Sequence, residues 1–227
     1  IDNIANIDWS SLPGSVSGQT SYEGTPSLDC ERSGNTADCG GAVNNYRASD
    51  PATVTVPTTP VKSLTSTSEA HTTGTSLVVG EIARYRLQMV WPEGTTINAM
   101  FQDNLPNNLQ FLNDSTAKIA FVSNSGDCTA SPTASMTSST LATAPWICGN
   151  ESNIATITPA FILPDPAVSS SSTANTDTYN SGTDAFFKFG TLTNSDSDTD
   201  AEYVVVEFNA LVLNNTNNQS GSNRNNT

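Results

Sequence analysis

Residues 80–91 (GEIARYRLQMVW) constrain the fold more than any other part of the chain, because polar and apolar residues alternate along them. One face would carry Ala83, Tyr85, Leu87, Met89 and Trp91, and the other would carry Arg84, Arg86 and Gln88. Period-two alternation of this length predicts an antiparallel strand with one buried face and one face in solvent.

Shorter strands are predicted along the rest of the chain. They cover residues 4–9, 52–56, 61–66, 95–102, 109–112, 117–122, 154–163, 185–192 and 201–213. Residues 95–102 are expected to form a hairpin with 80–91, and the last strand should line the core with Val204, Val206, Phe208, Ala210 and Val212. Turns rich in Gly, Pro and Asn separate the strands. The pattern is typical of an all-β, immunoglobulin-like antiparallel β-sandwich with long polar loop insertions.

Four regions are expected along the chain. Residues 1–14 contain an N-terminal strand, 15–50 a loop-rich excursion, 51–213 the sandwich core, and 214–227 a polar tail or linker. Within the core, residues 124–150 and 167–184 are rich in Ser and Thr, and the second of these is expected to be a mobile surface loop.

The charge excludes several classes of partner. The formal net charge is -14, with only eight Lys and Arg residues, so nucleic acids and anionic lipid surfaces would be repelled. No apolar run approaches the roughly 20 residues that span a bilayer, so no membrane insertion is expected. The chain starts at Ile1 without a signal peptide, and is expected to be mature or excised.

The cysteines and the sequons favour an extracellular or cell-surface location. Four cysteines permit three pairings, and their spacing favours Cys30–Cys39 and Cys128–Cys148 over free thiols in a reducing compartment. Five Asn-x-Ser/Thr sequons are candidate glycosylation sites: Asn113, Asn150, Asn214, Asn218 and Asn225. Chance is the alternative for the sequons, since the chain is rich in these residue types.

Three segments carry a family resemblance. They are 80–86 (GEIARYR), 92–98 (PEGTTIN) and 102–109 (QDNLPNNL). Together they resemble the immunoglobulin-like tandem repeat domains of large microbial surface proteins and the isopeptide-forming fimbrial domains. The resemblance is good over residues 62–112 and looser over 203–221. It implies a scaffolding role in stalks, filaments, adhesins or surface layers, without catalysis.

The order of the motifs predicts how copies of the chain would assemble. In the repeats, the Asn-Gln-x-Gly stretch near the C-terminus leads into one more strand, but a segment that resembles this strand lies here at residues 5–14. If the strand cannot fold back, it would add to a neighbouring copy head to tail, with Ile4, Ile7 and Trp9 at the subunit interface. Such a contact does not close and builds a fibre. The alternatives are pairing within its own domain or excision from a tandem array.

An acidic run is the candidate metal site. Asp196, Asp198, Asp200 and Glu202 alternate along residues 194–202, and a tight loop would direct their oxygens to one Ca²⁺. The run lacks the Gly and the distal Glu of an EF-hand loop. The alternative is a solvated acidic turn.

Lys62 lies near the start of a predicted strand, where the isopeptide-forming relatives place their lysine. Such a bond needs a desolvated, neutral lysine, an acceptor and a nearby acid, and Asn209 is the candidate acceptor. An ordinary surface lysine is the favoured alternative, because two other lysines also lie in predicted strands.

The sequence favours a structural protein over an enzyme. It has one histidine, no Gly-x-Ser-x-Gly elbow and no phosphate-binding loop. The first hypothesis is a structural subunit or repeat of an extracellular filament or surface protein, assembled from copies of itself by strand donation. The alternative is an adhesin or carbohydrate-binding module that binds glycans or other surface components through its variable loops.

Overall fold

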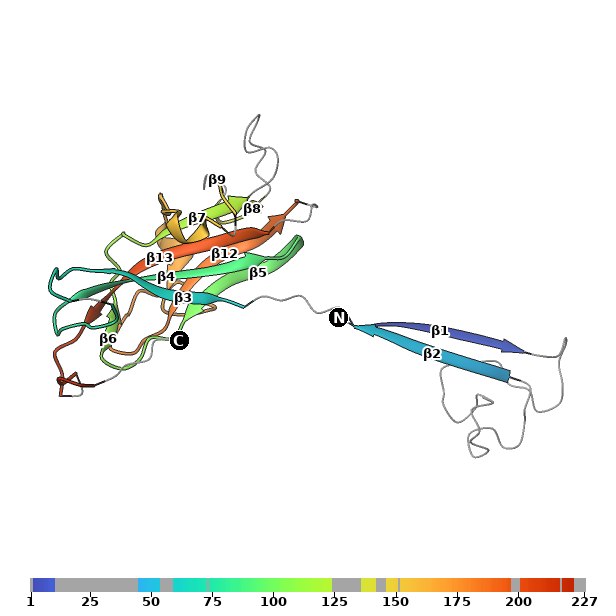
Figure 1. Cartoon of the computed structure of the whole chain (residues 1–227), viewed down its shortest axis with the longest axis horizontal. Coiled ribbons are helices and arrows are strands. Elements are labelled where there is room, and N and C mark those ends of the chain that lie inside the picture. The colour runs from blue at the N-terminus through green and yellow to red at the C-terminus, as the bar shows by residue number, and fades with distance from the viewer. Residues whose placement is uncertain are drawn as a thin grey trace. The chain divides into compact units, whose positions relative to one another are not determined.

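The computed structural model describes residues 2–10, 45–53, 59–72, 74–123, 136–141, 146–150, 152–196, 201–216 and 218–222. The chain divides into two compact units, Ile1–Pro57 and Thr58–Thr227 (Figure 1). The described elements are β-strands and two short 3-10 turns. None of the described residues forms a helix long and apolar enough to cross a bilayer.

The first unit contains a two-stranded antiparallel ribbon. Strand β1 (Asp2–Ser10) pairs with β2 (Asn45–Thr53) in one unbroken register, which places Ile7 opposite Ala48 and Trp9 opposite Tyr46. Residues 51–53, predicted at the start of the sandwich, lie in β2 instead. A ribbon of two strands is marginally stable by itself in water, so the ribbon gains from further packing or pairing.

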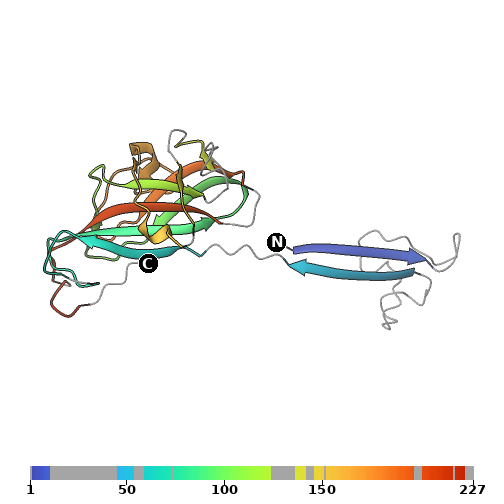
Figure 2. The same ribbon diagram turned by 45° about the horizontal axis from the view of Figure 1, so that its top comes forward.

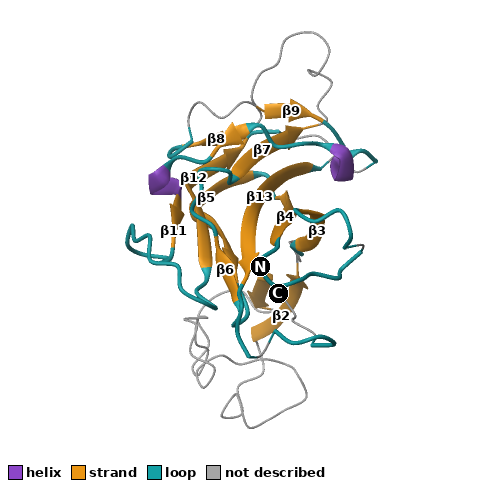
Figure 3. Cartoon of the chain, turned by 90° about the vertical axis from the view of Figure 1, so that its left-hand side faces the viewer, coloured by secondary structure: helices purple, strands orange, loops and turns teal. Residues whose placement is uncertain are grey.

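The second unit is a sandwich of two sheets, and the predicted all-β sandwich is confirmed. The wide sheet has the strand order β10 (Phe161–Ile162), β7 (Lys118–Ser123), β13 (Glu202–Val212), β4 (Ile82–Trp91) and β3 (Val61–Thr67), and β6 (Leu109–Phe111) and β9 (Trp146–Cys148) also pair with it. The narrow sheet has the order β11 (Val168–Ser169), β12 (Ala185–Asn194) and β5 (Gly94–Asp103), and β8 (Met136–Ser138) pairs with β12. Figure 3 looks along the sandwich and separates the two sheets.

Strand β13 is buried on both of its faces. On the inner face, Val204, Val206, Phe208 and Ala210 are fully buried in the main core, as predicted. The Phe208 ring lies 5.1 Å from the ring of Phe187 in the narrow sheet. On the outer face a second cluster forms from Ala120, Val122, Ile154, Ile157, Tyr203 and Val205. Burial on both sides explains why apolar residues run almost without interruption along this strand.

The predicted hairpin between 80–91 and 95–102 is wrong. Strand β5 forms, but it pairs with β12 in the narrow sheet, whereas β4 pairs with β3 and β13 in the wide sheet. The link through Pro92 and Glu93 to Gly94, whose φ is 97°, therefore carries the chain from one sheet to the other. The rings of Trp91 and Phe101 consequently lie 6.2 Å apart in the core.

Two further segments differ from the prediction. Residues 154–163 form the 3-10 turn η2 (Ile154–Thr156) and only the short strand β10, because carbonyl groups of this segment bind the Arg86 side chain instead of a neighbouring strand. Residues 167–184, expected to be a surface loop, are exposed at 172–178 as predicted, but Val168 and Tyr179 pack on the core, and the Tyr179 ring lies 4.6 Å from that of Phe111.

The core on β13 should dominate the stability of the sandwich. We expect Phe208→Ala to lower the free energy of unfolding by about 3–5 kcal/mol, because it opens a cavity between the sheets. Ile97→Ala should change it by no more than about 0.5 kcal/mol, because Ile97 is 73% exposed. Urea denaturation followed by tryptophan fluorescence measures both. Similar losses in the two variants would contradict this account of the core.

Candidate functional site

A buried ion pair joins the two sheets at one side of the sandwich. Lys62 lies in β3 of the wide sheet, and its Nζ contacts Oδ1 of Asp103 in β5 of the narrow sheet. The side chains of Lys62 and Asp103 are 15% and 1% exposed. The ammonium group lies 5.0 Å from the centre of the Tyr85 ring and 6.0 Å from that of Phe208, so aromatic faces enclose it.

The surroundings change the protonation of this lysine. Burial lowers the pKa of the Lys62 ammonium below its ordinary value, although the charge of Asp103 and its hydrogen bond oppose the shift. A buried amine whose charged form is destabilised, next to a carboxyl group, meets two of the requirements for an isopeptide bond. The arrangement holds the two sheets together as an ion pair.

The structure does not bring Lys62 and Asn209 together. Successive residues of a strand point to opposite faces, and Asn209 follows the inward-facing Phe208. Its amide donates to Asp114 Oδ2 at 3.1 Å and to Thr116 Oγ1 at 2.8 Å on the outer face of the wide sheet. The position beside Lys62 belongs to Asp103, which lies in the segment 102–109 that carries the family resemblance. The signal in the sequence was that Asp103 alternates with Ala99 and Phe101, which places its side chain on the same inward face of β5.

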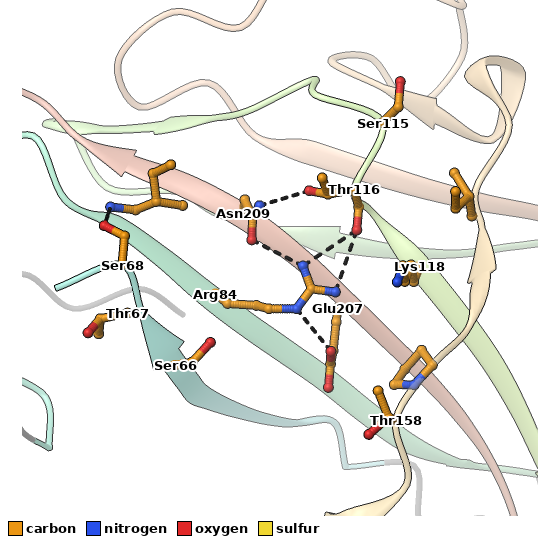
Figure 4. Close-up of a pocket in the computed structure, with 13 residues that line it drawn as sticks. Ser66, Thr67, Ser68, Arg84, Ser115, Thr116, Lys118, Thr158, Glu207 and Asn209 are labelled. Atoms are coloured by element: carbon orange, nitrogen blue, oxygen red, sulfur yellow. Dashed lines mark hydrogen bonds and ion pairs between the residues drawn. The ribbon is translucent and has the colours of Figure 1, made fainter. Parts of the chain in front are cut away.

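A polar hollow of about 600 Å³ lies on the outer face of the wide sheet (Figure 4). Arg84 lies at its floor and donates to Glu207 Oε2 at 3.0 Å and to Asn209 Oδ1 at 3.1 Å. The Asn209 amide is bound to Thr116 and Asp114 in turn. The polar groups on the floor of the hollow thus bind one another.

Arg86 was predicted to face solvent, and this is wrong. Residues 154–157 cover it, and it is 5% exposed. Its guanidinium donates to the carbonyl oxygens of Ile157 at 2.7 Å and Ile154 at 2.5 Å, and to Glu207 Oε1 at 3.2 Å. Burial lowers the pKa of Arg86, and Glu207 opposes the shift. The residue fastens the 154–157 segment to the sheet.

The predicted calcium ligands lie only partly within the described residues. Asp198 and Asp200 fall outside them. Asp196 Oδ2 accepts from Ser123 Oγ at 3.3 Å, and the 2% exposed Glu202 accepts at Oε2 from the Asn194 amide at 3.0 Å. Over the described ranges, no group of three His, Cys, Asp or Glu side chains is placed to hold a metal ion. The calcium site stays a prediction.

The cysteines lie outside what the structure describes. Cys30, Cys39 and Cys128 fall outside the described residues, and Cys148 is described only as part of the backbone of β9. Both predicted disulfides therefore stay predictions.

The sequons differ in how accessible the structure makes them. Asn113 and Asn214 are exposed, Asn150 is partly buried, and Asn225 lies outside the described residues. The Asn218 amide donates to the carbonyl oxygens of Asn108 at 3.1 Å and Leu213 at 2.8 Å. A glycan on that nitrogen would remove one of these bonds, so Asn218 is the least suitable acceptor of the described sequons.

The predicted interface residues Ile4, Ile7 and Trp9 all lie in β1, which pairs with β2 of the same chain. Donation to a neighbour would therefore carry a ribbon of two strands.

Comparison with known proteins identifies no relative. No family model, no curated protein and no solved structure matches this chain.

The Lys62–Asp103 pair should behave as a coupled unit. Asp103→Ala should lower the free energy of unfolding by about 2–4 kcal/mol, because it leaves a half-buried ammonium without a counter-charge. The double variant Lys62→Met/Asp103→Leu should lose much less, because no charge is then buried. Chemical denaturation of both variants and the Lys62→Met single variant completes the double-mutant cycle. Additive losses would contradict the coupling.

The pair should also make stability depend on pH. Because the folded-state pKa of Lys62 is lowered, the unfolded chain binds this proton more tightly. The free energy of unfolding should therefore rise with pH, relative to the Lys62→Met variant, as the pH passes from the folded-state pKa towards the ordinary lysine value. If the free energy of unfolding changes with pH in the same way in the wild type and in Lys62→Met, the lowered pKa of Lys62 would be contradicted.

Proposed function

We propose that this chain is a structural module of an extracellular filament or cell-surface protein, arranged so that tension along the chain acts on the sandwich from end to end. The observation that carries the proposal is the direction of the first and last strands of the sandwich. Both β3 and β13 pair antiparallel with β4, so they run parallel to each other on either side of it. Residues 61 and 205 lie opposite Gln88, and residues 67 and 210 lie opposite Ala83.

This register places the start of β3 and the end of β13 at opposite ends of the sandwich, as Figure 2 also shows. Tension between them would slide β3 and β13 in opposite directions along β4. Many ladder hydrogen bonds would then resist together, whereas a pull at one end of a strand pair breaks them one after another. Such a module transmits force well.

The buried ion pair supports the same role. Lys62 is the second residue of β3, close to the point where tension from the preceding chain arrives. Its contact with Asp103 ties this edge strand to the opposite sheet. The strand is thus held by its pairing with β4 and by a cross-sheet contact.

Other observations agree with a surface role. The resemblance to surface-protein repeats implies scaffolding, the net charge of -14 disfavours nucleic-acid partners, and the cysteines and sequons fit secretion. The proposal assigns no catalytic step. Assembly of copies head to tail by strand donation is part of it.

A glycan-binding module is the second candidate, and the polar hollow over Arg84 is the observation that favours it. Two features make it the weaker proposal. The polar groups on the floor bind one another, and none of the described residues that line the hollow is aromatic, although aromatic faces are a common means of holding sugars.

Pulling the molecule between single-molecule tethers tests the proposed function. The full chain held at its two ends should show a strong rupture of the sandwich, because the pull shears β3 and β13 against β4. The same chain held at residues 61 and 88, which pair at one end of β3 and β4, should yield at a clearly lower force. Equal forces in the two geometries would overturn the proposal.

Two variants test the role of the ion pair in the same measurement. Lys62→Met/Asp103→Leu should lower the end-to-end force, because it removes the cross-sheet contact. Lys118→Met, a change at a partly exposed lysine of β7, is the matched control and should leave the force unchanged.

A further inference from the structure

We propose that the free edge of β5 accepts the β1–β2 ribbon of a second copy of this chain, with β1 antiparallel to β5. The inference rests on the proposed function, because it names the surface through which one module would join the next. The joined sheet would have the strand order β12, β5, then β1 and β2 of the neighbour.

The first observation is that β5 has an open edge. It pairs with β12 along one side, and no other described strand pairs with it. Its sequence, GTTINAMFQD, contains no lysine and no proline, and its one charged residue, Asp103, is buried. Edge strands usually carry charges or prolines that prevent pairing with another chain. The edge of β5 has no protecting lysine or proline. Its pairing with β12 is irregular around Ile97 and Asn98, where Asn98 has a φ of 53° and Ile97 is 73% exposed.

The second observation is that the narrow sheet does not cover the whole of the wide sheet. Its main path has three strands, β11, β12 and β5, against five from β10 to β3 in the wide sheet. On the inner face of the wide sheet, burial decreases from β13 through β4 to the edge strand β3. Phe208 in β13 is 0% exposed, Tyr85 in β4 is 9% exposed, and Leu64 in β3 is only partly buried.

Strands added at β5 would therefore extend the narrow sheet opposite β3. The partly buried Leu64 and Lys62 would gain cover, and so would the Lys62–Asp103 pair, since Asp103 ends β5. Strands added at β3 would instead lengthen the wide sheet where nothing opposes it. The edge of β5 is therefore the better acceptor, because only strands added there would cover the inner face of β3.

The ribbon matches β5 in length, and β1 carries an apolar pattern that suits a strand packed on a core. Its strands have nine residues each, against ten in β5. Its two strands, the described part of the unit Ile1–Pro57, form an isolated ribbon, and a two-stranded ribbon gains stability from further pairing. In β1, apolar residues alternate at Ala5, Ile7 and Trp9, which suits a strand with one face on a core.

The two strands of the ribbon are suited to different places. Strand β1 has no proline, so every N–H group on the side away from β2 is present for pairing. Strand β2 carries Pro51, which lacks an N–H, and each strand carries two charged residues, Asp2 and Asp8 in β1 and Arg47 and Asp50 in β2. Proline is typical of an outer edge. With β1 on β5, β2 becomes the outer strand, which suits its Pro51.

Association of the full chain tests the inference. The wild type should form open oligomers as its concentration rises, measured by sedimentation velocity, because a head-to-tail contact does not close. Ile97→Lys on the acceptor edge should weaken association by about tenfold or more. Ile162→Lys is the matched control: Ile162 is 52% exposed in β10, at the other edge of the wide sheet, and its substitution should leave association unchanged.

Mixing two variants distinguishes donor from acceptor. Ile7→Asp should disable the ribbon, and Ile97→Lys should disable the acceptor, so each protein alone should stay monomeric. Their mixture should form a dimer with one copy of each, because one supplies the intact ribbon and the other the intact edge. Thermal unfolding of each variant shows that the sandwich has folded.

Three results would overturn the inference: a wild type that stays monomeric, an Ile97→Lys variant that associates like the wild type, or a mixture that forms no dimer. A monomeric wild type would place the ribbon elsewhere, including on β5 of its own chain. None of these results changes the force needed to rupture a single sandwich. A failed docking surface with a high end-to-end rupture force would therefore leave the load-bearing part of the proposed function standing, whereas equal forces in the two pulling geometries would overturn it whatever the association shows.

Discussion

The pairing of β13 with β4 is the interaction on which the rest of the sandwich depends. The two strands are in register from Glu202 opposite Trp91 to Leu211 opposite Ile82, and β7 and β6 continue the sheet from the other edge of β13. One face of β13 carries the main core, and its other face carries a second cluster. The same pairing makes β3 and β13 parallel, because both lie antiparallel to β4. Under the proposed function, this pairing would also set the direction in which the sandwich bears tension.

The sandwich is complete at that centre and incomplete at the side of β3 and β5. There the described part of the narrow sheet ends at β5, and a lysine fills part of the inner face of the wide sheet, held by a carboxylate from the narrow sheet. A buried ion pair is costly without further contacts. Under the proposed function, the pair would also tie an edge strand against tension and lie beside the added ribbon, which would account for its position.

The strands were predictable wherever polar and apolar residues alternate along the sequence, because this alternation follows from the geometry of the strand itself. Alternation identified β4, and the inward-facing side of β13 was named correctly from Val204 to Val212. Non-local facts were not predictable. The link at Pro92–Gly94 reads equally well as a hairpin and as a crossing between sheets, so β5 was given the wrong partner. Arg86 was assigned to solvent because no local signal shows that residues 154–157 fold over it. Asp103 was missed as the partner of Lys62 because the two lie 41 residues apart in different sheets.

An electron cryomicroscopy reconstruction of the assembled full chain tests the central claim most directly. The account predicts continuous filaments in which each sandwich carries a two-stranded ribbon from its neighbour, with the first strand antiparallel to β5 and the second at the outer edge. Isolated particles, or filaments in which the edge of β5 is bare and the ribbon binds elsewhere, would contradict it.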